Sequence, residues 1–356
     1  MATHSMSYRK RLVRLLSVLI IGVAPPSCQA QPSFDVELGM MLHFRGADTA
    51  TIKRQFDLMA EMHVTWVRLD IDWSVVEPER GQFDWLHTDE LFNEARAHGI
   101  NVLAVLAFSP AWARPSDTGP EAKGSHSRPD QLSDYGDFAR VAAQRYAPLG
   151  VHSWEIWNEP NSITFWPPGP DPDEYGLLFR EAADAIRAVD PTATLLVGGL
   201  APKYRGPEAG MSPAEHLVKL YANGTAQLAD GIAVHPYTFP ALPRDARQHN
   251  VGGFTDLPAL HNVMSRRGDG QKKVWITEFG APTGTGPTAV SEEEQAEALI
   301  KARKLVGRWD WAGPLIYYEL VDGGTDPTDV EQNFGVLRED LSLKPAAVAL
   351  IDELWR

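Results

Sequence analysis

The sequence predicts an α/β fold, a (β/α)8 TIM barrel, and three observations lead to that prediction. Short apolar runs alternate with stretches of helical periodicity along the whole chain, a pattern typical of βα units around a parallel sheet. There are eight such units, which favour a closed barrel over an open doubly wound sheet. No linker, low-complexity tract or nucleotide-binding glycine fingerprint interrupts the alternation.

The elements follow one another in strand–helix pairs. Each expected strand is a short apolar run, and each expected helix repeats its apolar residues with the period of an amphipathic helix. The expected strands cover residues 36–42, 65–71, 101–107, 153–157, 194–199, 231–234, 274–279 and 314–320. The helices that follow them cover residues 50–62, 87–98, 132–146, 172–189, 213–223, 257–267, 291–308 and 344–355. The longest irregular segment, 113–130, follows the third strand, which in a barrel places it over the mouth.

Residues 1–30 are typical of a secretion signal. Basic residues come first, then the apolar stretch 15–24, which has about half the length of a membrane-spanning helix. We therefore expect no stable membrane insertion, cleavage after Ala30, and a secreted protein with a single catalytic barrel over residues 31–356. A lipid anchor at Cys28 is the alternative, but the residues before it match a lipobox poorly.

Charge and cysteine content narrow the possible partners. The 47 acidic residues outnumber the 33 basic ones, for a formal net charge of −14. A surface of this sign repels nucleic acid, so we expect no nucleic-acid partner. Cys28 is the single cysteine, and the 11 histidines show no tight paired spacing, so we expect neither a metal nor another cofactor.

Two glutamates end predicted strands on opposite sides of the barrel. Barrel enzymes carry their chemistry at the carboxyl ends of the strands. Glu159 follows the fourth strand and Glu278 ends the seventh, so closure of the barrel brings them together. Glycoside hydrolysis requires two carboxyl groups on either side of one glycosidic bond. We expect Glu159 to act as general acid and base, and Glu278 as nucleophile.

The two carboxyl groups need different surroundings. Glu278 must stay ionised, and we expect Arg68 on the second strand and the hydroxyl of Tyr237 after the sixth to stabilise its charge. Glu159 must keep its proton, which burial and the charge of Glu278 both promote. Asn158 is placed to donate a hydrogen bond to a sugar 2-hydroxyl.

Three segments resemble clan A glycoside hydrolases, and they occur in the clan's order along nearly the whole chain. They are Trp73-Ser74-Val75-Val76-Glu77-Pro78 with Gly81 and Trp85, Trp157-Asn158-Glu159-Pro160-Asn161, and Trp275-Ile276-Thr277-Glu278-Phe279-Gly280. The second is similar to the clan's acid/base segment and the third to its nucleophile strand. Arg68, His235 and Tyr237 also stand where the clan has these residue types. The resemblance implies a retaining glycoside hydrolase.

Within the clan, three short motifs are most similar to family 39 and its bacterial relatives, which include xylosidases, iduronidases and biofilm-polysaccharide endohydrolases. These motifs are Asn158-Glu159-Pro160-Asn161, Asn333-Phe334-Gly335 and Lys344-Pro345. One position departs from the clan. Many members carry a Trp at the end of the eighth strand as a floor for the sugar, whereas this chain has Tyr317-Tyr318-Glu319. One of these tyrosines, with Tyr318 as our candidate, is expected to replace that platform.

Further candidates to bind sugar lie near the strand ends. Trp112 and Trp166 are expected to contact substrate, because aromatic faces pack on the apolar faces of pyranose rings. His43 and Asp72 are candidates to bind hydroxyl groups. His235 has two interpretations, as a site residue or as a satisfied histidine of the barrel interior.

The sequence therefore predicts a secreted retaining glycosidase that cleaves a β-type bond in an oligo- or polysaccharide through a covalent glycosyl-enzyme intermediate. Two alternatives stand beside it. A barrel that binds carbohydrate without cleaving it would be expected to lack a catalytic carboxylate or the supporting Arg68, and this sequence lacks neither. A transglycosylase would use the same residues, so analysis of products separates it from a hydrolase.

Overall fold

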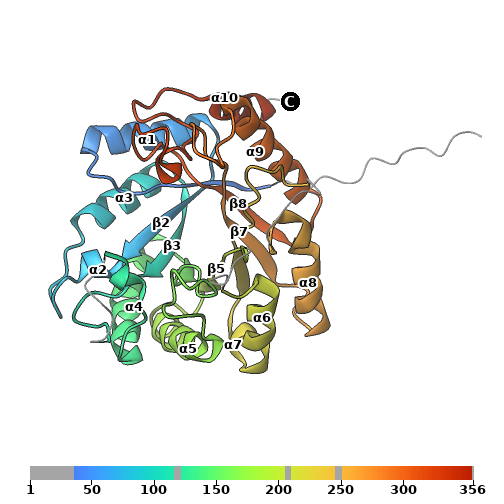
Figure 1. The fold of residues 1–356 in the computed structure, drawn as a ribbon. Coiled ribbons are helices and arrows are strands. Elements are labelled where there is room, and N and C mark those ends of the chain that lie inside the picture. The colour runs from blue at the N-terminus through green and yellow to red at the C-terminus, as the bar shows by residue number, and fades with distance from the viewer. Residues whose placement is uncertain (1–35, 116–121, 205–209, 245–250, 355–356) are drawn as a thin grey trace, which may run out of the picture. The chain divides into compact units, whose positions relative to one another are not determined.

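The computed structural model describes residues 36–115, 122–204, 210–244 and 251–354, which all belong to one compact unit. Eight parallel strands close into a barrel in sequence order, and the eighth strand pairs with the first. Figure 1 shows the strands at the centre, with the helices around them. The predicted (β/α)8 barrel is therefore confirmed. The predicted signal lies outside the described residues.

The observed strands agree closely with the predicted ones. They are β1 (Leu38–Met41), β2 (Trp66–Asp72), β3 (Asn101–Ala107), β4 (Ser153–Ile156), β5 (Thr194–Leu200), β6 (Gly231–Val234), β7 (Lys273–Phe279) and β8 (Ala312–Tyr317). The largest difference is in β8. Pro314, predicted as its first residue, lies inside the strand, where the register with β7 shifts. Because proline lacks an N–H, it fits an irregular pairing better than a regular ladder. After Tyr317 the chain leaves the ladder, although the Tyr318 amide still donates to the Phe279 carbonyl at 2.9 Å.

Eight longer helices among the described residues surround the barrel near the predicted positions. They are α1 (Thr49–Glu61), α3 (Leu86–Ala97), α4 (Leu132–Tyr146), α5 (Pro172–Val189), α6 (Pro213–Ala222), α8 (Leu257–Arg266), α9 (Glu292–Val306) and α10 (Pro345–Leu354). The periodicity missed α2 (Trp73–Val76) and α7 (Thr225–Leu228), because a single turn is too short to show a repeat. No helix in the described ranges is long and apolar enough to cross a membrane.

Side-chain caps explain where several helices begin. The Asp48 carboxylate accepts from the Thr51 amide at 2.8 Å at the start of α1. Ser212 and Ser291 each form a capping box with a glutamate three residues later, at the starts of α6 and α9. Such caps satisfy amides that lack a partner in the first helical turn and contribute about 1 kcal/mol each.

The interior of the barrel changes from apolar to polar towards the carboxyl ends of the strands. One buried cluster consists of Met41, Leu103, Leu196, Ala233, Trp275 and Ile316. His235 and Thr277 come two residues after Ala233 and Trp275, so the alternation of the strands points them to the same side, one layer further along. Arg68 and Glu155 are also buried, at 1 % and 0 % exposed. A layer of polar and charged side chains therefore lies beneath the mouth.

The segment predicted to cover the mouth follows β3 and is described at both ends. The Asp130 amide donates to the Ala113 carbonyl at 2.7 Å and closes the segment at its base. The ring of His126 lies 4.7 Å from that of Phe108 and 4.5 Å from that of Phe165, so the segment packs against residues that follow β3 and β4. Residues 116–121 lie outside the described ranges.

Candidate active site

The segment after β4 turns sharply and presents Glu159. Trp157 and Glu159 adopt positive φ angles of 70° and 47°, a left-handed conformation that is uncommon for residues with bulky side chains. Asn161 holds the turn against the end of β5. Its side-chain amide donates to the carbonyls of Ala201 and Met211 at 2.7 and 2.8 Å, and its oxygen accepts from the Ala201 amide at 2.9 Å. Backbone strain of this kind needs such support and is found mostly at functional sites.

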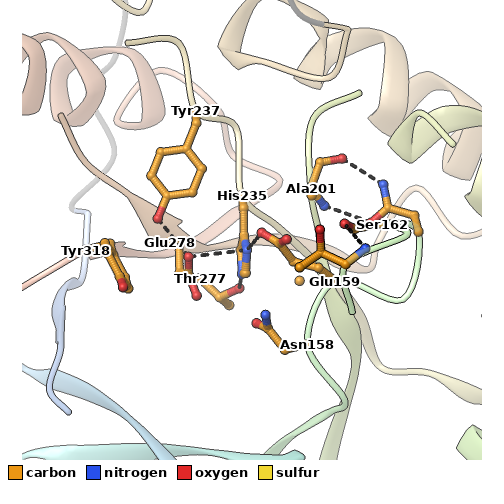
Figure 2. Close-up of polar contacts among 12 residues, drawn as sticks. Asn158, Glu159, Ser162, Ala201, His235, Tyr237, Thr277, Glu278 and Tyr318 are labelled. Carbon is orange, nitrogen blue, oxygen red and sulfur yellow. Dashed lines mark hydrogen bonds and ion pairs between the residues drawn. The ribbon is translucent and has the colours of Figure 1, made fainter. Parts of the chain in front are cut away.

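Glu278 is held by two donors from different strands. Arg68 Nη1 on β2 donates to Glu278 Oε1 at 2.6 Å. The Tyr237 hydroxyl after β6 donates to Oε2 at 2.7 Å (Figure 2). Arg68 also donates from Nη2 to Asn158 Oδ1 at 2.8 Å. Glu278 is 8 % exposed, so these contacts replace most of its hydration. The two donors predicted for Glu278 are both in place.

His235 lies between the two carboxyl groups. Its Nδ1 is 2.9 Å from Glu159 Oε1 and 3.4 Å from Glu278 Oε2, and its Nε2 is 3.1 Å from Thr277 Oγ1. Figure 2 shows the imidazole beside both carboxylates. The ring is fully buried at the end of β6. His235 is thus a site residue and a satisfied barrel histidine at once, and the two predicted interpretations are compatible.

Gly199 makes room for this histidine. A Cβ atom at position 199 would lie 1.9 Å from His235 Nε2, closer than any real contact. The Gly199 carbonyl also accepts from the Glu159 amide at 3.2 Å, and its own amide donates to Glu155 Oε1 at 2.9 Å. Any side chain at this position would therefore displace the imidazole from its place between the carboxyl groups.

The electrostatic surroundings of the two carboxyl groups differ. Burial, and then the negative charge of Glu278, raise the pKa of Glu159 well above its usual value. Burial also raises the pKa of Glu278, but Arg68 and the Tyr237 hydroxyl oppose that rise. Because the two groups interact, they titrate as a pair, in which the proton resides on Glu159 and the charge on Glu278. Burial and the charge of Arg68 lower the pKa of His235 well below its usual value, so its imidazole is neutral.

A match to a known family accompanies this arrangement. The family model of cellulases, glycosyl hydrolase family 5, matches residues 30–313. The chain belongs to this family. Family 5 is part of clan A, so the predicted resemblance to clan A is confirmed.

Three similar proteins extend the comparison of this family 5 member. A β-xylosidase of Geobacillus stearothermophilus is 29% identical over 124 residues, which cover 33% of this chain and 24% of that protein. A family 39 glycoside hydrolase of Bacteroides cellulosilyticus WH2 has a TM-score of 0.70 at 23% identity, over 90% of this chain and 64% of that one. A monomeric β-xylosidase of Caulobacter crescentus CB15 has a TM-score of 0.68 at 20% identity, over 90% and 68% of the two chains. The predicted likeness to family 39 thus extends to the barrel fold, whereas the matching family model is that of family 5.

Tyr318 and His43 line the side of the site formed by β8 and β1. Their rings meet edge to face at a centroid distance of 5.7 Å, and Tyr318 also packs edge-on against Tyr237 at 6.3 Å. His43 Nδ1 lies 3.4 Å from Asp70 Oδ2. By contrast Tyr317 is fully buried and its hydroxyl donates to the Leu299 carbonyl at 2.7 Å. Of the two adjacent tyrosines, Tyr318 therefore faces the site.

Trp166 does not lie where a sugar can reach it. The side chain is 1 % exposed and packs edge-on between Trp157 and Tyr175, at 5.7 and 5.8 Å. The prediction that Trp166 contacts substrate is wrong. The segment after β4 folds inward at this residue, so the ring belongs to the core beneath the site.

Trp112 and Asp72 make mainly local contacts. The Trp112 indole N–H donates to the Glu77 carbonyl at 2.9 Å, and the Arg80 guanidinium covers its ring at 4.3 Å. Asp72 Oδ1 accepts from the Ser74 amide at 2.9 Å and caps α2. These contacts tie the segments after β2 and β3 together. Substrate contacts by Trp112 and Asp72 remain predictions.

A substitution separates packing from substrate binding at Trp166. We expect Trp166→Ala to lower the free energy of unfolding by about 3–5 kcal/mol, because it removes a fully buried aromatic ring. The KM of the folded enzyme is expected to stay close to that of the native protein. Denaturant unfolding and steady-state kinetics measure the two effects, and Trp112→Ala serves as a half-buried control. A raised KM with unchanged stability would show that Trp166 contacts substrate after all.

Four residues in or near the site were not predicted from the sequence. Glu155 lies inside β4 and binds Arg68, and its signal was a glutamate in an otherwise apolar strand. Glu331 Oε2 lies 3.5 Å from the Tyr318 hydroxyl. Tyr204 is 52 % exposed after β5, and desolvation, followed by the charge of Glu159, raises its pKa. Arg45 lies after β1 and donates to both oxygens of Glu319 at 2.9 and 2.7 Å.

The two motifs near the C-terminus support the segment after β8. Lys344 is buried and donates to Asp322 Oδ1 at 2.8 Å and to Thr283 Oγ1 at 2.9 Å. Asn333 donates to the carbonyls of Asp326 and Asp329 at 2.7 and 2.6 Å. A cavity of about 670 Å³ lies beside these residues, and neither Glu159 nor Glu278 lines it. The two motifs therefore stabilise the conformation of this segment.

One group of described side chains has a geometry that fits a metal ion. Donor atoms of Glu159, His235 and Glu278 all lie within 4.8 Å of one another. Both oxygens of Glu278 already accept hydrogen bonds, from Arg68 and Tyr237. We expect prolonged dialysis against a chelator to leave kcat and KM unchanged, because a pair of carboxyl groups can hydrolyse a glycoside without a metal. A loss of activity that added zinc or calcium restores would contradict this expectation.

Proposed function

We propose that this family 5 chain is a retaining glycosidase that hydrolyses a β-type bond in an oligo- or polysaccharide by double displacement. The observation that carries the proposal is the short distance between the two carboxyl groups. An oxygen of Glu159 and an oxygen of Glu278 lie within 4.8 Å of each other. Retaining enzymes hold their carboxyl groups about 5–5.5 Å apart, whereas inverting enzymes need about 6.5–9.5 Å to admit a water.

The contacts support one role for each carboxyl group. Glu278 accepts from a buried cation and a hydroxyl, so it is the ionised nucleophile. Glu159 contacts the neutral His235 and no Arg or Lys among the described residues, so it holds the proton. Asn158 accepts from Arg68 through Oδ1, which turns its amide NH2 outward to donate to the sugar 2-hydroxyl.

The reaction then proceeds in two steps. Glu159 gives its proton to the leaving oxygen while Glu278 attacks the anomeric carbon, so the C–O bond breaks as a glycosyl ester forms. Glu159, now a carboxylate, takes a proton from water, whose oxygen attacks the same carbon and releases Glu278. Both charges return to their starting state, and the configuration is retained because the carbon is inverted twice.

The names of similar proteins suggest which substrates to test first. Two of them are β-xylosidases, so β-xylosides and xylan fragments come first in a panel of plant, bacterial and host polysaccharides. Tyr318 is the proposed floor for the sugar at the bond that is cleaved. We also propose that the protein is exported through residues 1–30 and cleaved after Ala30, with a lipid anchor at Cys28 as the alternative.

The experiment that tests the proposal follows the anomeric proton of the product by NMR. We expect the β-anomer to form first and then to mutarotate. First appearance of the α-anomer would exclude retention. Binding of an oligosaccharide without any product would favour the carbohydrate-binding alternative, and sugar oligomers longer than the substrate would favour transglycosylation.

A further inference from the structure

Glu155 is a fully buried carboxylate below the proposed catalytic pair. Both of its oxygens accept from Arg68, Oε1 from Nη2 at 2.8 Å and Oε2 from Nε at 3.2 Å. The Gly199 amide donates to Oε1 as well. Glu155 therefore binds one edge of the guanidinium in the bidentate geometry that fixes its plane and direction.

The other edge of the same guanidinium donates hydrogen bonds to residues of the site. Nη1 donates to Glu278 at 2.6 Å and Nη2 to Asn158 at 2.8 Å. Arg68 and Glu155 are 1 % and 0 % exposed, so solvent screens their charges little. One positive charge is thus shared between two carboxylates inside the barrel, and only one of those carboxylates reaches the site.

We propose that Glu155 is a positioning residue for the reaction, which holds the Arg68 guanidinium in place and takes up part of its charge so that Glu278 stays reactive. The proposal rests on the proposed function, because it takes Glu278 as the nucleophile. An arginine bound to Glu278 alone would stabilise that carboxylate more strongly and make it less basic and a poorer nucleophile. The shared arrangement keeps Glu278 ionised without this loss.

Several charged and titratable groups act on Glu278, and Glu155 is the one that the test below substitutes. The charged and titratable groups that act on it are Arg68 from β2, Glu155 and Glu159 from β4 and the segment after it, Tyr204 after β5, His235 and Tyr237 from β6 and its loop, His43 after β1 and Tyr318 after β8. Glu155 is among the groups that raise the pKa of Glu278. Removing the charge of Glu155 is therefore expected to lower the pKa of Glu278.

The test is a titration of the glutamate side chains by NMR in protein with ¹³C-labelled carboxyl groups, where Glu278→Gln assigns the Glu278 signal. We expect Glu155→Gln to move the titration of Glu278 to lower pH by about one unit, since Arg68 then serves Glu278 alone. The acid limb of kcat/KM is expected to move in the same direction, and kcat to fall about ten- to a hundredfold as Arg68 loses its fixed direction.

Asp322→Asn is the matched control. Asp322 is also a buried carboxylate in an ion pair, with Lys344 at 2.8 Å, and it makes no contact with Arg68. If Glu155 only stabilised the fold, the melting temperature would fall in both variants, and kcat would fall no further in Glu155→Gln than in Asp322→Asn. A shift in Glu155→Gln no larger than in Asp322→Asn overturns the proposal.

A second variant covers the case in which Glu155→Gln does not fold. Glu155→Asp keeps the charge but shortens the side chain, so it is expected to lower kcat while the titration of Glu278 stays near its native position. A native kcat in this variant would overturn the positioning role. The NMR titration needs no turnover. An enzyme without glycosidase activity that still shows the shift would therefore refute the proposed function alone.

Discussion

Glu278→Ala is expected to reduce kcat by roughly 10⁵-fold on any substrate that the native enzyme cleaves, because no other group can form the covalent intermediate. The fold is expected to survive. Arg68 keeps both hydrogen bonds to Glu155, so removal of Glu278 leaves a paired cation in the barrel. Kinetics with an aryl β-glycoside, together with a thermal melt of the same preparation, measure both effects.

Azide provides the control for Glu278→Ala. The truncated side chain leaves space for a small anion beside Arg68 and the Tyr237 hydroxyl, the two donors that hold the native carboxylate. With a substrate whose leaving group needs no proton, azide is expected to attack the anomeric carbon from the nucleophile's side and yield an α-glycosyl azide. Ordinary activity in Glu278→Ala, or a β-glycosyl azide as the product, would show that the nucleophile is misassigned.

The parts of this protein that follow from local pattern were predictable from the sequence. The alternation of apolar runs and helical periods gave the barrel, and closure of a barrel is enough to bring Glu159 and Glu278 together. The donors to Glu278 were predictable for the same reason. Arg68 lies within β2 and Tyr237 follows β6, so their position in the barrel follows from their position in the chain.

Features that depend on the direction in which a side chain points could not be predicted from the sequence. Trp166 and Tyr318 are both aromatic residues in segments that follow a strand, yet the first packs inward and the second faces the site. Glu155 was missed because its partner Arg68 is 87 positions away in the sequence, and the two strands approach only across the interior of the barrel. The pattern of apolar residues predicts where a strand ends, but side-chain packing determines which of the residues there face the site.

Glu159→Gln is expected to lower kcat/KM for a natural glycoside by about 10²–10⁴-fold, because an alkoxide is a poor leaving group without a proton donor. The pH profile is the sharper measurement. In the proposed mechanism, native activity requires Glu159 protonated and Glu278 ionised, so it is lost as pH rises through the raised pKa of Glu159 and as pH falls through that of Glu278. Glutamine does not titrate, so the alkaline limb is expected to disappear.

The acid limb should stay where it is in Glu159→Gln. At the pH where Glu278 takes up its proton, Glu159 is already neutral in the native enzyme, so an amide in its place leaves the field at Glu278 unchanged. A dinitrophenyl glycoside, which needs no proton donor, is expected to form the intermediate at a nearly native rate and then to stall, because no base activates the water. The result is a burst of phenolate with low kcat and low KM. An alkaline limb that survives in Glu159→Gln would assign the proton to another group.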